Sequence, residues 1–112
     1  MEQDNSDLFR QRVTDTLADK IFNTPASSKI LKRLRECHMY STLGKISLFF
    51  YRSMISGDEI NWFFEKCNYD LGLFVIVTLH LSRQKDGSKL FDSMLYGNPI
   101  LFDYILDELK NE

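Results

Sequence analysis

The 112-residue sequence is poor in cysteine, proline and glycine, with two, two and five residues respectively. One cysteine pair, Cys37 and Cys67, is too little for the disulfide framework of a small secreted domain, and free cysteine ordinarily behaves as a small core hydrophobe. We therefore expect two reduced, structural thiols. The glycines are scattered singly, with no GxGxxG or GxxxxGK[ST] run to wrap a phosphate, so no nucleotide site is indicated.

Long apolar runs and a leader sequence are also lacking. The longest apolar run covers residues 71–81, which is eleven residues, whereas a membrane-spanning helix needs about twenty. The first five residues show neither the basic nor the apolar region of a signal peptide. We therefore expect no membrane span and an intracellular, cytoplasmic location, with the nucleus left open.

Catalytic and metal-ligating patterns are sparse. His80 lies within the apolar run, where a core histidine is the ordinary outcome, and the neighbours Cys37 and His38 would diverge by about 100° on a helix. A long-range pair of Cys67 with His80 is the catalytic alternative that stays open. None of these residues has the C-x2-C or H-x3-H spacing typical of structural zinc sites. We expect no enzymatic activity, no metal, no cofactor and no small-molecule substrate.

The composition is that of a small folded domain. Hydrophobic residues make up 44% and charged residues 27% of the chain, and fifteen aromatic residues (nine Phe, five Tyr, one Trp) can each bury a large area. A chain of this length buries enough surface for one continuous core. We therefore predict a single domain over residues 1–112.

Local signals favour helices throughout. Ser56 and Glu59 match the capping box, Asp70 is a suitable cap, and Asn98-Pro99 suits a helix start. The β-branched residues 75–78 would also suit a strand, but a lone strand would leave its backbone groups unpaired. We predict an all-α, compact bundle of six to seven short helices around a central apolar helix at about 71–84. The other helices are expected at about 6–23, from 27 or 28 to about 37, at 43–55 and 57–67, between breaks at Gly87 and Gly97, and at 99–110.

The bundle carries more apolar residues than one face per helix requires. In the first helix Phe9, Val13, Leu17 and Ile21 recur at i+4, the spacing of a core-facing stripe. The third helix has one broad apolar face, and Leu48, Tyr51 and Ile55 form a second apolar flank outside that face. Several large side chains fall outside the stripes of their helices: Leu8, Phe22, Leu48, Tyr51, Ile55, Trp62, Ile100 and Tyr104.

This surplus predicts a non-catalytic protein-interaction module, an adaptor or regulatory subunit that binds another protein or a second copy of itself. The expected anchors are Tyr51 and Trp62, with Leu48 and Ile55 as flanking contacts. The alternative is that these side chains form a second side of the core.

Charge is distributed unevenly along a chain of net charge −2. Residues 29–52 hold six Lys/Arg against Glu36, whereas residues 88–112 hold two Lys against five acidic residues. The basic residues Lys29, Lys32, Arg33 and Arg35 are expected either to steer an acidic partner or to bind phosphate. The second role is that of a small nucleic-acid-binding protein using the basic helices at 29–52, whose affinity would depend strongly on salt.

Overall fold

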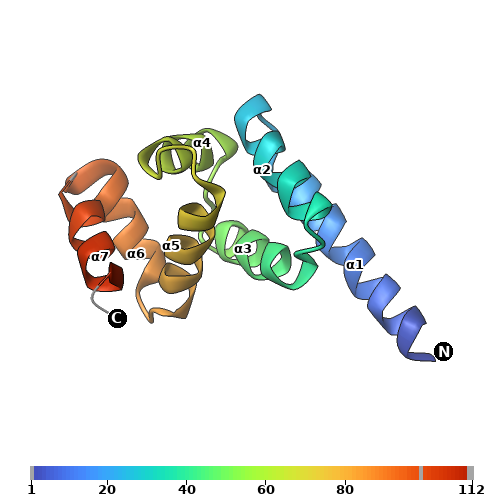
Figure 1. The fold of residues 1–112 in the computed structure, drawn as a ribbon. Coiled ribbons are helices and arrows are strands. Elements are labelled where there is room, and N and C mark those ends of the chain that lie inside the picture. The colour runs from blue at the N-terminus through green and yellow to red at the C-terminus, as the bar shows by residue number, and fades with distance from the viewer. Residues whose placement is uncertain (1, 99, 111–112) are drawn as a thin grey trace.

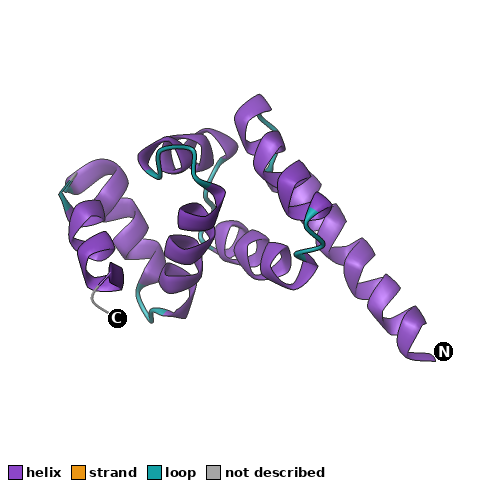
Figure 2. Cartoon of the chain, viewed as in Figure 1, coloured by secondary structure: helices purple, strands orange, loops and turns teal. Residues whose placement is uncertain are grey.

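The structure is a computed structural model that describes residues 2–98 and 100–110, with side chains described over 7–98 and 100–109. All regular elements of this part of the chain are helices (Figure 2), which confirms the predicted all-α bundle. In chain order they are α1 (Glu2–Ile21), α2 (Pro25–Glu36), α3 (Tyr40–Arg52), α4 (Gly57–Lys66), α5 (Leu71–Arg83), α6 (Gly87–Asp92), the π-helix η1 (Ser93–Gly97) and α7 (Leu101–Lys110).

Ser56 and Asp70 cap the middle helices as predicted, but the capping box is only half formed, because the Glu59 carboxylate accepts a hydrogen bond from the Ser56 hydroxyl and not from the Ser56 amide. The Ser56 hydroxyl accepts a hydrogen bond from the Glu59 amide at 3.2 Å, and the Asp70 carboxylate accepts one from the Leu73 amide at 3.1 Å. Each satisfies an amide that has no partner within its own helix. The Asn98 side chain accepts a hydrogen bond from the Ile100 amide just before α7. The predicted role of Pro99 as the first residue of this helix falls outside the described residues.

The start of α2 was predicted two to three residues late. Pro25 is the first residue of α2 and follows Thr24 in an extended conformation. Proline suits the first helical turn because its missing amide hydrogen has no intrahelical partner to lose. The Thr24 carbonyl accepts the first helical hydrogen bond, from the Ser28 amide at 2.8 Å. The Thr24-Pro25 pair therefore both follows α1 and begins α2.

Three helices end in the same left-handed turn without glycine. After α3, the Ile55 amide donates to the Phe50 carbonyl at 2.9 Å, across Met54 with a φ of 56°. His38 after α2 and Asn68 after α4 occupy the equivalent left-handed position. This is the Schellman motif, which usually places glycine at the left-handed residue. In each turn, the amide of the residue after the left-handed position donates a hydrogen bond to a carbonyl of the helix that has just ended.

The core is an aromatic cluster centred on α5. Phe74 of α5 lies 6.0 Å from Phe50 of α3 and 5.6 Å from Phe63 of α4, measured between ring centroids. Phe91 of α6 lies 5.3 Å from Phe63, and all four rings are fully buried. The β-branched segment is therefore a helix packed by three neighbours. Ile76 nevertheless faces solvent, so α5 is not covered on every side.

The long helix α1 packs mainly against α3, and its N-terminal part extends past the other helices (Figure 1). Its C-terminal part is covered: Ile21 is buried, and Phe22, expected outside the core stripe, is buried just after the helix end. Phe9 and Val13, expected in the core stripe, are 68% and 52% exposed. The reason is the face that α1 turns to its neighbour: Thr14 lies against Gly44 of α3 and Ala18 is buried, so Phe9 and Val13 lie beside the packed face and not on it.

Candidate functional site

The four predicted partner-binding residues do not form one patch. Leu48 and Tyr51 on α3 are 38% and 60% exposed, Trp62 on α4 is half-buried, and Ile55 is buried. The expected apolar surface therefore exists at Leu48 and Tyr51, while the other two residues lie elsewhere.

The assignment of Ile55 to the exposed flank was wrong. That assignment assumed a helix continuing to residue 55, but α3 ends at Arg52. Ile55 is the residue that follows left-handed Met54, and its amide bonds back to Phe50. The Schellman turn thus folds Ile55 into the core and leaves Met54 outside.

Trp62 is held by its neighbours. Its ring packs edge to face on Phe91 of α6, with ring centroids 6.5 Å apart, and the Lys66 Nζ lies 5.6 Å from the ring centroid. A cation over an indole face is a favourable arrangement. Trp62 therefore joins α4 to α6 and presents only part of its surface to solvent.

The exposed apolar surface at Leu48 and Tyr51 continues onto α1. Phe9 and Val13 line two adjoining hollows, one of about 630 Å³ that Leu48 also lines and one of about 460 Å³ that Tyr51 also lines. We call these two hollows together the α1/α3 groove. The sequence did not identify Phe9 and Val13 as part of it, because their i+4 spacing is the same as that of core residues.

The rim of the α1/α3 groove is basic. Arg10, Lys45 and Asp7 border the first hollow, and Arg12 and Lys20 border the second. Among the described side chains that line the two hollows, four are cationic and one is a carboxylate. A ligand that fits this groove must offer apolar side chains at its centre and negative charge at its edges.

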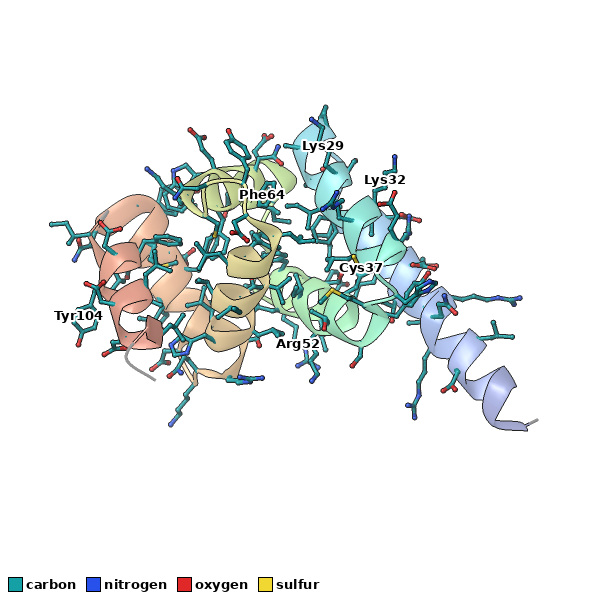
Figure 3. All side chains as sticks on the ribbon, viewed as in Figure 1. Lys29, Lys32, Cys37, Arg52, Phe64 and Tyr104 are labelled. Carbon is teal, nitrogen blue, oxygen red and sulfur yellow. The ribbon has the colours of Figure 1, made fainter. Side chains whose placement is uncertain are left out.

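An acidic face of matching character lies on α7. Asp103, Tyr104, Asp107 and Glu108 are all exposed, and their i, i+1, i+4, i+5 spacing places them on one side of the helix. Ile100, just before α7, is 70% exposed. A hydrogen bond to the Glu108 carboxylate raises the pKa of Tyr104. Figure 3 shows Tyr104 at the end of the molecule away from the N-terminus of α1.

The four predicted basic residues also divide into two groups. Arg35 is bound to α1, with its Nε 3.1 Å from Asp15 and its Nη2 2.8 Å from Asp19. Arg35 therefore joins α2 to α1. Its guanidinium is already paired with two carboxylates, so it does not have the phosphate-binding role expected from the sequence. Lys29, Lys32 and Arg33 are exposed and line one cavity of about 580 Å³ together.

The two cysteines differ in environment. Both are free; Cys67 is buried as expected, whereas Cys37 is exposed just after α2 and is not a core residue. Burial, with a smaller contribution from nearby Asp70, raises the pKa of Cys67 to about 12. Because the thiolate is the reactive form, Cys67 is a poor nucleophile at neutral pH. His80, the other residue of the catalytic alternative, is half-buried.

Within the residues described, no group of three or more His, Cys, Asp or Glu side chains is placed to hold a metal ion. The helices of this part of the chain are all too short or too polar to cross a membrane. Comparison with protein-family models, with curated proteins and with solved structures found no match. The functional assignment therefore rests on the surfaces themselves.

Proposed function

We propose that this chain is a non-catalytic, self-associating interaction module, in which α7 of one copy docks in the α1/α3 groove of another. The observation that carries the proposal is the exposed apolar centre of the groove, formed by Phe9, Val13 and Tyr51, inside a basic rim. Large exposed apolar patches with polar rims are typical of protein interfaces.

Charge complementarity supports a second copy as the occupant. The acidic face of α7 offers Asp103, Asp107 and Glu108 around the exposed Tyr104 ring. These groups match the basic rim and apolar centre of the groove. A groove-to-groove dimer would instead oppose two basic rims, which is unfavourable.

Such a contact joins two different surfaces of the same chain. The N-terminus of α1 and the helix α7 lie at opposite ends of the molecule (Figure 1). A head-to-tail contact of this kind produces rings when it closes and open chains when it does not. The expected behaviour is a mass that rises with protein concentration and falls with salt.

Sedimentation velocity on two complementary variants tests the proposal. Phe9→Ala with Tyr51→Ala disables the groove, and Tyr104→Ala with Asp107→Lys disables the α7 face. Each double variant should be monomeric alone, because each lacks one half of the contact. An equimolar mixture should form a heterodimer and nothing larger, since each partner retains one intact half.

Ile76→Ala is the matched control, because Ile76 is also exposed but lies on α5 outside both surfaces. This variant should associate as the wild type does. Self-association of the α7 variant would show groove-to-groove contact and overturn the proposal. A wild type that stays monomeric at every concentration would also overturn it and assign the groove to a different acidic protein.

A further inference from the structure

A second candidate site lies between α2 and the turn that joins α4 to α5. It is the cavity of about 580 Å³ lined by Lys29, Lys32 and Arg33, with Phe64 and Tyr69 on the opposite side. Figure 3 shows Lys29 and Lys32 on α2 and Phe64 on α4, and these two helices pack against each other. We call it the basic-aromatic cleft, and its volume is within the usual range for small-molecule sites.

The cations of the cleft come from one face of α2. Residues 29, 32 and 33 are three and four positions apart, so they lie along one side of the helix. Glu36 is the one carboxylate among the described residues that line the cleft, and its Oε1 lies 3.8 Å from the Lys32 Nζ in an exposed pair. Among the described side chains, Lys29 and Arg33 form no ion pair. The cleft therefore keeps a positive balance for an anionic ligand.

The aromatic side of the cleft presents a fixed ring to solvent. Tyr69 packs edge to face on Phe64, with ring centroids 5.5 Å apart, yet Tyr69 is 64% exposed. Asn68 and Tyr69 both have left-handed backbone, with φ of 56° and 59°. Asn68 belongs to the Schellman turn that ends α4, and this turn places Tyr69 at the edge of the cleft.

We propose that the basic-aromatic cleft binds a nucleotide unit, with phosphate on Lys29, Lys32 and Arg33 and the base stacked on Tyr69. Basic side chains beside an exposed aromatic ring are the combination that binds single-stranded nucleic acid without sequence preference. A free mononucleotide offers the same phosphate and base. The site is separate from the α1/α3 groove and does not depend on the proposed self-association.

The ring distinguishes this ligand from an acidic peptide. Three cations would attract carboxylates as well as phosphates, but an acidic peptide without aromatic residues, such as polyglutamate, has no ring to stack on Tyr69. Loss of the ring should therefore weaken nucleotide binding and leave binding of an acidic peptide unchanged.

Fluorescence anisotropy with a labelled oligothymidylate tests the proposal, using the Phe9→Ala, Tyr51→Ala protein so that self-association does not interfere. Binding should weaken with salt with a logarithmic slope of about −2, since three cations each contribute about −0.7 on a single strand. Competition with thymidine monophosphate identifies a mononucleotide site. Competition by the oligomer alone identifies a single-strand site.

Paired variants separate the cleft from general charge. Lys29→Ala with Lys32→Ala should weaken oligothymidylate binding about tenfold and flatten its salt dependence. Lys45→Ala with Arg52→Ala removes the same charge from α3 and should change binding little. Tyr69→Ala should weaken binding about tenfold through lost stacking. Tyr104→Ala, which removes a similarly exposed ring on α7, should not weaken it. Circular dichroism checks that each variant is folded.

Three results would overturn the assignment. One is no detectable binding of either probe at low salt. Another is an equal loss in both charge pairs, which would indicate diffuse attraction to the whole protein. The last is full displacement by polyglutamate together with no effect of Tyr69→Ala, which would assign the cleft to acidic proteins.

Discussion

Phenylalanine has opposite roles in two regions of this molecule. In the α3–α6 core, Phe50, Phe63, Phe74 and Phe91 are fully buried and contact one another. In the first half of α1, Phe9 stands in solvent beside an open groove. The same residue type therefore holds the fold together in one region and is available to a partner in the other.

The difference follows from how many helices surround each residue. The core rings lie where α3, α4, α5 and α6 meet, so each ring has partners on several sides. The N-terminal part of α1 extends past the other helices (Figure 1), and Phe9 and Val13 lie beside an open hollow between α1 and α3. Stability and binding should therefore be separable by mutation.

The largest expected effect is on the core. Phe63→Ala should lower the free energy of unfolding by about 4 kcal/mol, because it removes a buried ring and leaves a cavity. Phe9→Ala should change it by less than about 0.5 kcal/mol, as is usual for exposed positions. Urea unfolding measures both. Equal losses in the two variants would contradict the division into core and binding regions.

Glycine substitutions give the next largest contrast. A methyl group at Gly87 would overlap the Leu81 backbone carbonyl, so Gly87→Ala should cost about 3 kcal/mol through forced separation of α5 and α6. At Gly44, where α3 faces α1, the nearest atom to that methyl group is the Thr14 hydroxyl oxygen at 3.4 Å. Gly44→Ala should therefore stabilise α3, by about 0.5 kcal/mol. Thermal unfolding should show a lower melting temperature for Gly87→Ala and a higher one for Gly44→Ala. A lower melting temperature for Gly44→Ala would show that α1 packs on α3 as tightly as the core helices pack on one another.

The smallest effect concerns the ion pairs that fasten α2 to α1. Arg35→Ala should lower the free energy of unfolding by about 0.5–1 kcal/mol, because Asp15, Asp19 and Arg35 are only partly shielded from water. Arg33→Ala, which removes a cation without an ion-pair partner among the described side chains, is the control. The difference between the two variants should shrink in high salt. A difference that persists would point to packing of the Arg35 stem instead.

Local signals in the sequence predicted most of the fold. The caps at Ser56 and Asp70 act over three residues, so their pattern identified the starts of α4 and α5. The apolar run at residues 71–81 predicted a central helix at about 71–84, and α5 covers Leu71–Arg83. These features depend only on neighbours along the chain, so the order of the residues is enough to recognise them.

The surfaces were harder to predict because they depend on where helices end and which helices meet. Ile55 was misplaced since a turn without glycine gives no visible stop signal. Phe9 and Val13 have core spacing but no covering helix. Pairing of Arg35 with Asp15 joins residues 20 apart in the chain. The contribution of Tyr69 to the basic-aromatic cleft likewise depends on the approach of α2 to the turn after α4.

The repeated left-handed turn has a practical consequence for spectroscopy. His38, Met54 and Asn68 sit at the corners between successive helices with their side chains in water, and Met54 is 89% exposed. A spin label or fluorophore attached at each corner would report the distances between helices while leaving the interior untouched. Three such probes would follow the opening of each corner separately during unfolding.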